Sequence, residues 1–249
     1  MSQTFSNAFM AEEKNRELIK EMLWGPNAIR QAEELASYFE ITKEMKILDL
    51  GAGVGLSSLY LVQKHEVNVF VTDLYADPTD NYERFKQINI EDKTLPMTLD
   101  ARQPMPFAHG YFDVIFSVGA YNMFGDNEAF IPNILPYVKK GGYIAASFPG
   151  LKADFGDNIP EEMKPYWEVA EVAKHVRGLD WWRNIFEKAQ GIEIITLSEQ
   201  NCHDIAWEEY LSTLNPEDGE ELGGKWTLDM KKAEAGKYYN TIQLVAKVK

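Results

Sequence analysis

Lys46-Ile-Leu-Asp-Leu-Gly-Ala-Gly-Val-Gly-Leu-Ser-Ser58 is the stretch that decides the fold. Ile47 to Leu50 is apolar and predicts a short buried strand, and the residues from Leu56 onward predict a helix. Three glycines stand between them at alternate positions. They have no Cβ, so the backbone can turn sharply and a ligand can approach it closely. The helix points its free N–H groups and positive dipole end into this turn, so the stretch predicts a cradle for a polar cofactor.

Strands and helices alternate from this stretch to residue 150. That alternation predicts an α/β fold with a doubly wound, mainly parallel sheet and right-handed crossovers. A strand over 192–197 and an antiparallel last strand over 241–248 bring the expected total to seven. The other expected strands are Ile47–Leu50, Val67–Leu74, Leu95–Leu99, Tyr111–Val118 and Tyr143–Phe148, and the expected helices of this part are Leu56–His65, one that starts at Asp77-Pro78, and Ala129–Tyr137.

We expect a single domain in three parts: a helical leader or lid over 1–45, a cofactor-binding core over 46–150, and insertion helices with the last strands over 151–249. The leader pattern predicts one helix over 8–23 and a second that has Pro26 in its first turn.

Four local patterns make finer predictions. Lys139-Lys140-Gly141-Gly142 is typical of a basic last turn and a glycine cap at a helix end. Residues 151–178 suggest a loop or short-helix insertion. Asp180 is placed to cap a helix bearing Trp181, Trp182, Ile185 and Phe186, whose aromatic residues are typical of core. In the last strand, alternation predicts Thr241, Gln243 and Lys247 on the outward face.

Composition narrows the class of protein. The 249 residues are 45% hydrophobic and carry a net charge of −14, which disfavours nucleic acid and anionic membranes as partners. Cys202 is the single cysteine, so no intramolecular disulfide can form. Because we find neither a signal peptide nor a membrane span in the sequence, we expect a cytoplasmic protein.

Two cofactor classes use a turn of this kind. The motif of dinucleotide dehydrogenases is G-x-G-x-x-G/A, which would require Gly or Ala at the position that Leu56 occupies. The third glycine instead comes one place early, at Gly55. Asp49 also stands where the dehydrogenase pattern is usually apolar. An NAD(P)-dependent oxidoreductase therefore stays open only as a disfavoured alternative.

Asp49-Leu-Gly51-Ala-Gly53-Val-Gly55 resembles the first motif of the class I S-adenosylmethionine-dependent methyltransferases, an acidic residue followed by x-G-x-G-x-G. The resemblance continues in order over about residues 46–150. Val71-Thr-Asp73 is similar to the end of the family's second strand, Leu99-Asp100-Ala101-Arg102 to its third-strand segment, and Phe112 to Ser117 to its fourth-strand motif.

The resemblance implies the cofactor contacts. Asp49 would meet the ammonium group of S-adenosylmethionine, directly or through water, Asp73 the ribose hydroxyls, and Asp100 the adenine amino group. The whole implied set is Asp49, Gly51, Ala52, Gly53, Gly55, Asp73, Leu74, Asp100, Ala101 and Ser117. The implied activity is methyl transfer to a small-molecule acceptor by in-line displacement, as in bacterial small-molecule enzymes of this family. The stretch Ser117-Val-Gly-Ala-Tyr121 lacks the Asn/Asp-Pro-Pro-Tyr-like motif of nucleobase and glutamine amino-methyltransferases.

Four residues are candidates for the acceptor pocket. Tyr121 and Asn122 follow the fourth strand, Trp24 could cover the pocket if the leader folds back, and His175 lies in the insertion. We infer no metal, and no residue stands out as a catalytic base. A methyltransferase-like module that binds without turnover therefore stays open as a second alternative. The pattern does not define the oligomeric state.

Overall fold

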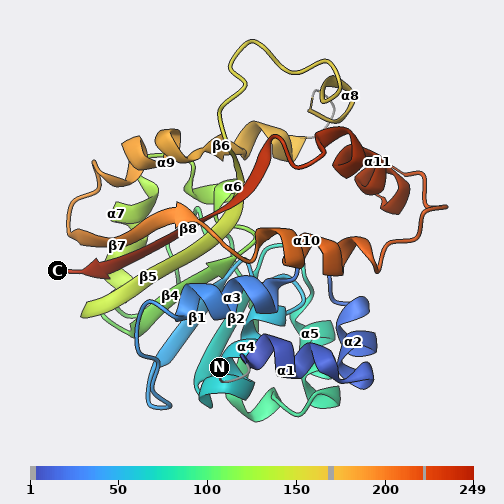
Figure 1. Cartoon of the computed structure of the whole chain (residues 1–249). Helices are drawn as coiled ribbons and strands as arrows, with labels where there is room; N and C mark the ends of the chain where they lie inside the picture. Colours follow the sequence, from blue (N-terminus) through green and yellow to red (C-terminus); the bar gives the residue numbers. More distant parts are fainter. Residues whose placement is uncertain (1–3, 168–170, 221–222) are drawn as a thin grey trace.

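One mixed sheet organises the chain (Figure 1), for which a computed structural model describes residues 4–167, 171–220 and 223–249. The strand order is β3-β2-β1-β4-β5-β8-β7, with β6 beside β5. Only β8 runs antiparallel to its neighbours. The predicted seven-stranded sheet with an antiparallel last strand is confirmed, and β6 is a two-residue addition. The strands are β1 Lys46–Leu50, β2 Asn68–Asp73, β3 Thr94–Thr98, β4 Phe112–Val118, β5 Val138–Leu151, β6 Arg177–Gly178, β7 Ile192–Glu199 and β8 Tyr239–Val248.

Helices cover both faces of this sheet. One core forms where α3, α4 and α5 pack on it, and a second forms where α7 and α9 pack on the other face. Because both faces are covered, β1 and β4 are buried throughout most of their length, which explains their nearly unbroken apolar sequences. The helices are α1 Phe5–Ala11, α2 Glu13–Lys20, α3 Ala28–Ala36, α4 Leu56–His65, α5 Pro78–Gln87, α6 Asn122–Gly125, α7 Phe130–Ile134, α8 Lys164–Trp167, α9 Leu179–Phe186, α10 His203–Leu211 and α11 Gly224–Glu234, with 3₁₀ turns η1 Glu91–Lys93, η2 Leu135–Tyr137 and η3 Glu171–His175.

The leader differs from its prediction at two points. The single helix expected over 8–23 is broken at Glu12, whose backbone is extended. Arg16 Nη1 donates to the carbonyls of Met10 and Ala11, so side chains satisfy the end of α1. Pro26 lies outside the second helix, because Asn27 is the N-cap and accepts a bond from the Ile29 N–H.

Two predicted helix caps are also wrong. Lys139 to Gly142 do not cap a helix but belong to β5, at an irregularity in its pairing with β4. The Cβ that Gly142 lacks would lie 2.5 Å from the Asp113 carbonyl oxygen, so this close backbone approach explains the glycine. The α9 helix starts at Leu179 with Gly178 as its N-cap, which leaves Asp180 in the first turn.

The outward face expected of the last strand is mostly buried. Thr241 and Gln243 lie under α3 and its C-terminal extension, and only Lys247 stays exposed. Gln243 Nε2 donates to the Tyr38 hydroxyl at 3.0 Å, and Gln243 Oε1 accepts from Gln200 Nε2 at 3.3 Å. Polar residues on this strand therefore mark a hydrogen-bonded interface, not solvent.

An ion pair fastens the leader to the far end of the chain. Arg30 on α3 donates to Glu209 on α10, with Nη2 to Oε1 at 2.6 Å and Nε to Oε2 at 3.1 Å. The two side chains are only 9% and 16% exposed.

Among the helices of the described ranges, none has both the length and the apolar character needed to cross a bilayer.

Arg30→Ala should destabilise the fold by about 3 kcal/mol, because it leaves the Glu209 carboxylate shielded from water and without its cation. Urea unfolding at pH 7 measures the change. Lys86→Ala is the matched control, since it breaks the exposed Lys86–Glu83 pair and should leave the unfolding midpoint unchanged. Equal effects of the two substitutions would contradict the structural role given to Arg30.

Candidate functional site

The candidate site lies where the chain reverses its direction of winding. Strands β2 and β3 lie on one side of β1, and β4 and β5 lie on the other. In open α/β sheets a ligand crevice forms at such a switch point, beyond the carboxyl ends of the strands. The glycine turn follows β1 at this edge, and α6 follows β4.

The glycine turn is held in a conformation that needs glycine. Gly51, Gly53 and Gly55 all have positive φ, at 73°, 55° and 90°. A Cβ on Gly51 would lie 2.5 Å from Ala120 Cβ, and one on Gly55 would lie 2.5 Å from the Phe85 ring. The Gly51 and Ala52 N–H groups donate to the carbonyl of Thr72 at 2.8 and 3.0 Å, which ties the turn to β2.

Asp49 lies fully buried behind this turn. The hydroxyls of Ser57 and Ser58 both donate to its Oδ2, each at 2.6 Å. Its Oδ1 is buried and has no hydrogen-bond partner among the described residues. Burial raises the pKa of Asp49 to about 6, against the two serine bonds that lower it. A buried oxygen without a donor fits a ligand that brings an N–H or a positive charge to it.

Asp73 joins the turn to the loop after β2. Its Oδ2 accepts from the Gly53 N–H at 2.9 Å, and its Oδ1 accepts from the N–H groups of Tyr75 and Ala76 at 2.8 and 3.0 Å. A carboxylate offers roughly four lone-pair directions. Three of these directions are used by backbone N–H groups, so one lone-pair direction, on Oδ2, remains for a ligand hydroxyl.

The loop after β3 presents Asp100 together with Arg102. The guanidinium donates to both carboxylate oxygens, with Nε to Oδ1 at 2.9 Å and Nη2 to Oδ2 at 3.0 Å. These hydrogen bonds hold the pKa of Asp100 below its usual range. Ala101 lines a cavity of about 180 Å³ that also reaches Arg102 and Ile134. The sequence pattern did not single out Arg102 as a partner, so this pairing is a finding of the structure.

The loop after β2 is apolar and open. Leu74 is 37% exposed and Tyr75 is 86% exposed. Ser117, in contrast, is buried, and its hydroxyl donates to the Leu50 carbonyl at 2.7 Å. Ser117 therefore ties the end of β4 to the end of β1, whereas Leu74 offers an apolar surface beside Asp73.

The acceptor candidates occupy different depths. Trp24 is 65% exposed, and its ring comes within 3.5 Å of the point where a Cβ on Gly53 would lie, so the leader folds back onto the turn. Tyr121 and Asn122 are buried, and the Tyr121 hydroxyl and Asn122 Oδ1 have no hydrogen-bond partner in the described parts of the chain. His175 Nδ1 lies 2.7 Å from Asp126 Oδ2.

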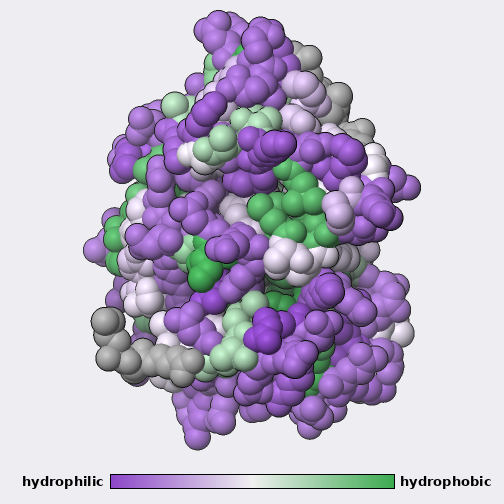
Figure 2. Space-filling view, turned by 45° about the vertical axis from the view of Figure 1, so that its right-hand side comes forward, coloured by the Kyte–Doolittle hydropathy of each residue, from purple (hydrophilic) through white to green (hydrophobic). Residues whose placement is uncertain are grey.

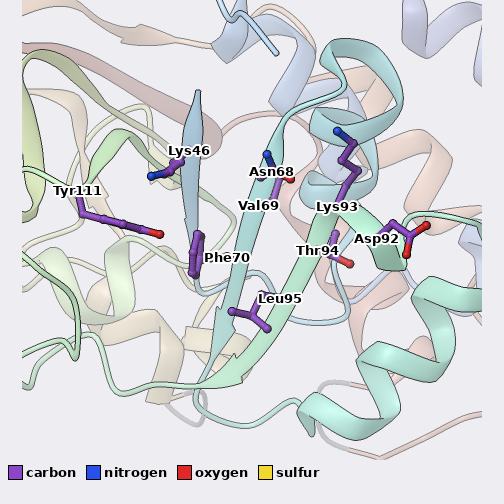
Figure 3. Close-up of a pocket in the computed structure, with 9 residues that line it drawn as sticks. All are labelled: Lys46, Asn68, Val69, Phe70, Asp92, Lys93, Thr94, Leu95 and Tyr111. Carbon is purple, nitrogen blue, oxygen red and sulfur yellow. The ribbon is translucent and has the colours of Figure 1, made fainter. Parts of the chain in front are cut away.

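The surface has two other features. Figure 2 shows a hydrophobic area, hollowed and surrounded by hydrophilic residues, on the face that it presents. A cavity of about 270 Å³ lies at the opposite edge of the sheet, where β1, β2 and β3 begin, and is lined by Lys46, Asn68 and Thr94 among others (Figure 3). That cavity is therefore separate from the glycine turn. Nowhere in residues 4–167, 171–220 and 223–249 do three or more His, Cys, Asp or Glu side chains gather as a metal site would need.

Residues 48–146 match a family model described as a methyltransferase domain. This part of the chain is therefore similar to a methyltransferase domain. The match covers β1 to β5 and includes Asp49, the glycine turn, Asp73 and Asp100.

Individual proteins similar to this domain differ in what they do. A 2-methyl-6-phytyl-1,4-hydroquinone methyltransferase of Synechocystis is 31% identical over 101 residues, which is 41% of this chain and 31% of the relative. The chain spans a third or less of the length of the curated relatives that it matches. The geranyl diphosphate C-methyltransferase of Streptomyces coelicolor, solved with Mg²⁺, geranyl diphosphate and S-adenosyl-L-homocysteine, has a TM-score of 0.66 at 15% identity and covers 88% of this chain and 78% of its own. The [4+2]-cyclase SpnF has a TM-score of 0.71 at 13% identity and covers 100% of this chain and 97% of its own. These structures share the fold.

The raised pKa of Asp49 sets the direction of a pH effect on stability. Between about pH 4 and pH 6 this carboxyl keeps its proton in the folded chain and loses it in the unfolded chain, so the folded state becomes less stable as pH rises. Asp49→Asn removes this effect. Relative to the wild type, the variant should gain up to about 3 kcal/mol on going from pH 4 to pH 7.5. Urea unfolding at several pH values measures the gain.

Asp100→Asn is the control for this measurement. The pKa of Asp100 is lowered, so its ionised form stabilises the fold and this contribution is lost as pH falls. The difference between Asp100→Asn and the wild type should therefore change with pH in the opposite sense. A difference for Asp49→Asn that is independent of pH would contradict the buried carboxylate described above.

Proposed function

We propose that this chain is an enzyme that transfers a methyl group from S-adenosylmethionine to a small-molecule acceptor. The observation that carries the proposal is the buried Asp49 carboxylate, whose Oδ1 has no partner among the described residues and lies behind a glycine turn. The methyltransferase domain match over 48–146 supports the reaction class. The relatives named above support a small acceptor, because a hydroquinone and geranyl diphosphate are the substrates that their names give.

The chain offers a complementary group for each polar part of the cofactor. Asp49 suits the ammonium group, and its second oxygen is available for it. Asp73, at the end of β2, suits a ribose hydroxyl, and Leu74 beside it offers apolar surface to the adenine. Asp100 can accept from the adenine amino group only while it shares its oxygens with Arg102.

The cofactor would supply a methyl group already activated by a sulfonium. The protein then has to bind the acceptor, orient it in line and keep water out. Holding two reactants in the right geometry can lower a barrier by about 7–11 kcal/mol. Trp24 lies against the glycine turn and can place its aromatic face towards a cation.

Two alternatives are weaker. Leu56, at the position where a dinucleotide site wants Gly or Ala, packs into the core at the start of α4, so an NAD(P)-dependent oxidoreductase is disfavoured. A module that binds without methyl transfer is the second alternative, and a cyclase with the same fold is the reason to test turnover separately from binding. In keeping with the charge of −14, we propose no nucleic-acid partner and a cytoplasmic location.

Calorimetric titration with S-adenosylhomocysteine and with NAD tests the cofactor assignment. We expect S-adenosylhomocysteine to bind and NAD to leave the calorimetric signal unchanged. Asp73→Ala should weaken S-adenosylhomocysteine binding at least tenfold, since it removes a charged hydrogen-bond acceptor. Binding of NAD alone would overturn the proposal.

Asp77→Ala is the matched control, four residues away. Asp77 caps α5 by accepting from the N–H groups of Thr79 and Asp80, and it faces solvent. Its loss should leave affinity for S-adenosylhomocysteine unchanged. Thermal unfolding of both variants without ligand separates lost binding from lost folding. Formation of S-adenosylhomocysteine with a set of phenols, amines and prenyl diphosphates then distinguishes an enzyme from a binding module.

A further inference from the structure

A histidine–aspartate pair stands at the edge of the sheet where the candidate site lies. His175 Nδ1 is 2.7 Å from Asp126 Oδ2, and the two side chains are 31% and 29% exposed. The residues are 49 positions apart in the chain, so only the fold brings them together. Asp126 ends α6, and His175 ends η3.

Two independent anchors fix the position of His175. On one side α6 packs against η3 and follows directly after β4. On the other side Arg177, two residues after His175, pairs with Gly150 at the carboxyl end of β5. His175 is therefore held beyond the carboxyl ends of β4 and β5, which are neighbours in the sheet.

The same helix carrying Asp126 touches the glycine turn. A Cβ on Gly51 would lie 2.5 Å from Ala120 Cβ and 3.2 Å from the Phe124 ring, so the start of α6 and the turn are in direct contact. Asp126 comes two residues after Phe124. The pair is thus connected to the proposed cofactor site by one short, packed helix.

Unpartnered polar atoms lie in this segment as well. The Tyr121 hydroxyl and Asn122 Oδ1 are buried without a hydrogen-bond partner in the described part of the chain. The Tyr121 Cζ atom, which carries the hydroxyl, is 2.6 Å from the point where a Cβ on Gly125 would lie, so this end of the ring sits beneath the residue that precedes Asp126. Burial raises the pKa of the Tyr121 hydroxyl, which stays protonated and can donate. The Tyr121 ring packs on Phe148 and Phe186 in the core, so these buried atoms lie beneath the His175–Asp126 pair and are not exposed with it.

The hydrogen bond to Asp126 gives the imidazole a defined role. A carboxylate at Nδ1 holds the proton there and turns Nε2 into the acceptor. Within residues 4–167, 171–220 and 223–249, Nε2 of His175 has no hydrogen-bond partner. General-base catalysis requires an oriented imidazole whose unprotonated ring nitrogen is available to accept a proton.

Charged groups on the surrounding elements define the electrostatic setting. The Asp126 carboxylate, at the C-cap of α6, contacts the imidazole. Lys174 on η3 and Arg177 on β6 are the cations nearest in sequence, and the Arg177 guanidinium lies over the Trp181 ring at 5.7 Å. Glu128, after α6, is paired with Lys188 at 2.6 Å. Asp126 is the one carboxylate in direct contact with His175 in the described residues.

We infer that His175, oriented by Asp126, takes the proton from the methyl acceptor, which makes the acceptor a molecule with a dissociable O–H or N–H at the reacting atom. The inference rests on the proposed function. The acceptor's proton passes to Nε2, and its electron pair forms the new bond to the methyl carbon. The carbon–sulfur bond breaks with its electron pair left on sulfur, and the imidazolium returns its proton to solvent.

NMR titration of ¹⁵N,¹³C-histidine-labelled protein tests this inference without knowledge of the acceptor. The His175 signals are assigned by their loss in His175→Gln. S-adenosylmethionine and S-adenosylhomocysteine differ by one methyl group and one positive charge, so a nearby imidazole responds to that charge. We expect the pKa of His175 to be lower with S-adenosylmethionine than with S-adenosylhomocysteine by about half a unit or more. We also expect the neutral ring to carry its proton on Nδ1.

His65 and His109 are internal controls, because they lie at the opposite edge of the sheet, at the end of α4 and before β4, and should not respond. Asp126→Asn should mix the two tautomers of the neutral His175 ring, because it removes the carboxylate that holds the proton on Nδ1. Equal pKa values of His175 in two complexes that both form, or a neutral ring protonated on Nε2, would overturn the inference and leave the cofactor assignment standing. Failure of both ligands to bind would overturn the proposed function itself, and the inference with it.

Discussion

A carboxylate shut away from water at the end of the central strand is the constraint on which the rest of the site depends. Asp49 Oδ2 is satisfied by two serine hydroxyls one helical turn into α4, and its Oδ1 has no donor within the described ranges. To hold such a charge, the chain must bring the N-terminus of α4, with its positive dipole end, close to the end of β1. A turn with positive φ angles at its three glycines makes that connection.

The elements built from local signals were predictable from the sequence. Strand β1, the glycine turn, helix α4 and the Asp77 cap of α5 each follow from patterns within a dozen residues, and the structure has all of them. The break at Glu12 and the buried polar face of β8 were not predictable, because each depends on side chains that satisfy backbone or polar groups across a tertiary contact. The same limit applies to the site. Ser57 and Ser58 could have been noticed, because they stand in the first turn of the helix that follows Asp49. The contact of Asp126 with His175 could not, because it arises only when β4 and β5 lie side by side.

The cofactor side and the acceptor side of the site have different origins. The proposed cofactor side comes from β1 to β4, within the part matched by the methyltransferase domain model. The proposed acceptor side comes from the leader, which places Trp24 on the turn, and from the segment after β5, which carries His175. Similarity of fold therefore says more about the proposed cofactor side than about the proposed acceptor side. The cyclase with the same fold illustrates that one fold can carry different chemistry.

The ion pair between Arg30 and Glu209 also bears on the order in which the chain acquires its structure during synthesis. The two residues are separated by 179 positions, and Gln243 on the last strand lies later still. Helix α3 emerges from the ribosome early, yet it cannot complete its contacts until nearly the whole polypeptide has been made. Its apolar face can meanwhile pack on α4 and on β4 and β5. The leader is thus made well before the segments that hold it, so a chain that stops before α10 would lack the Glu209 partner of Arg30.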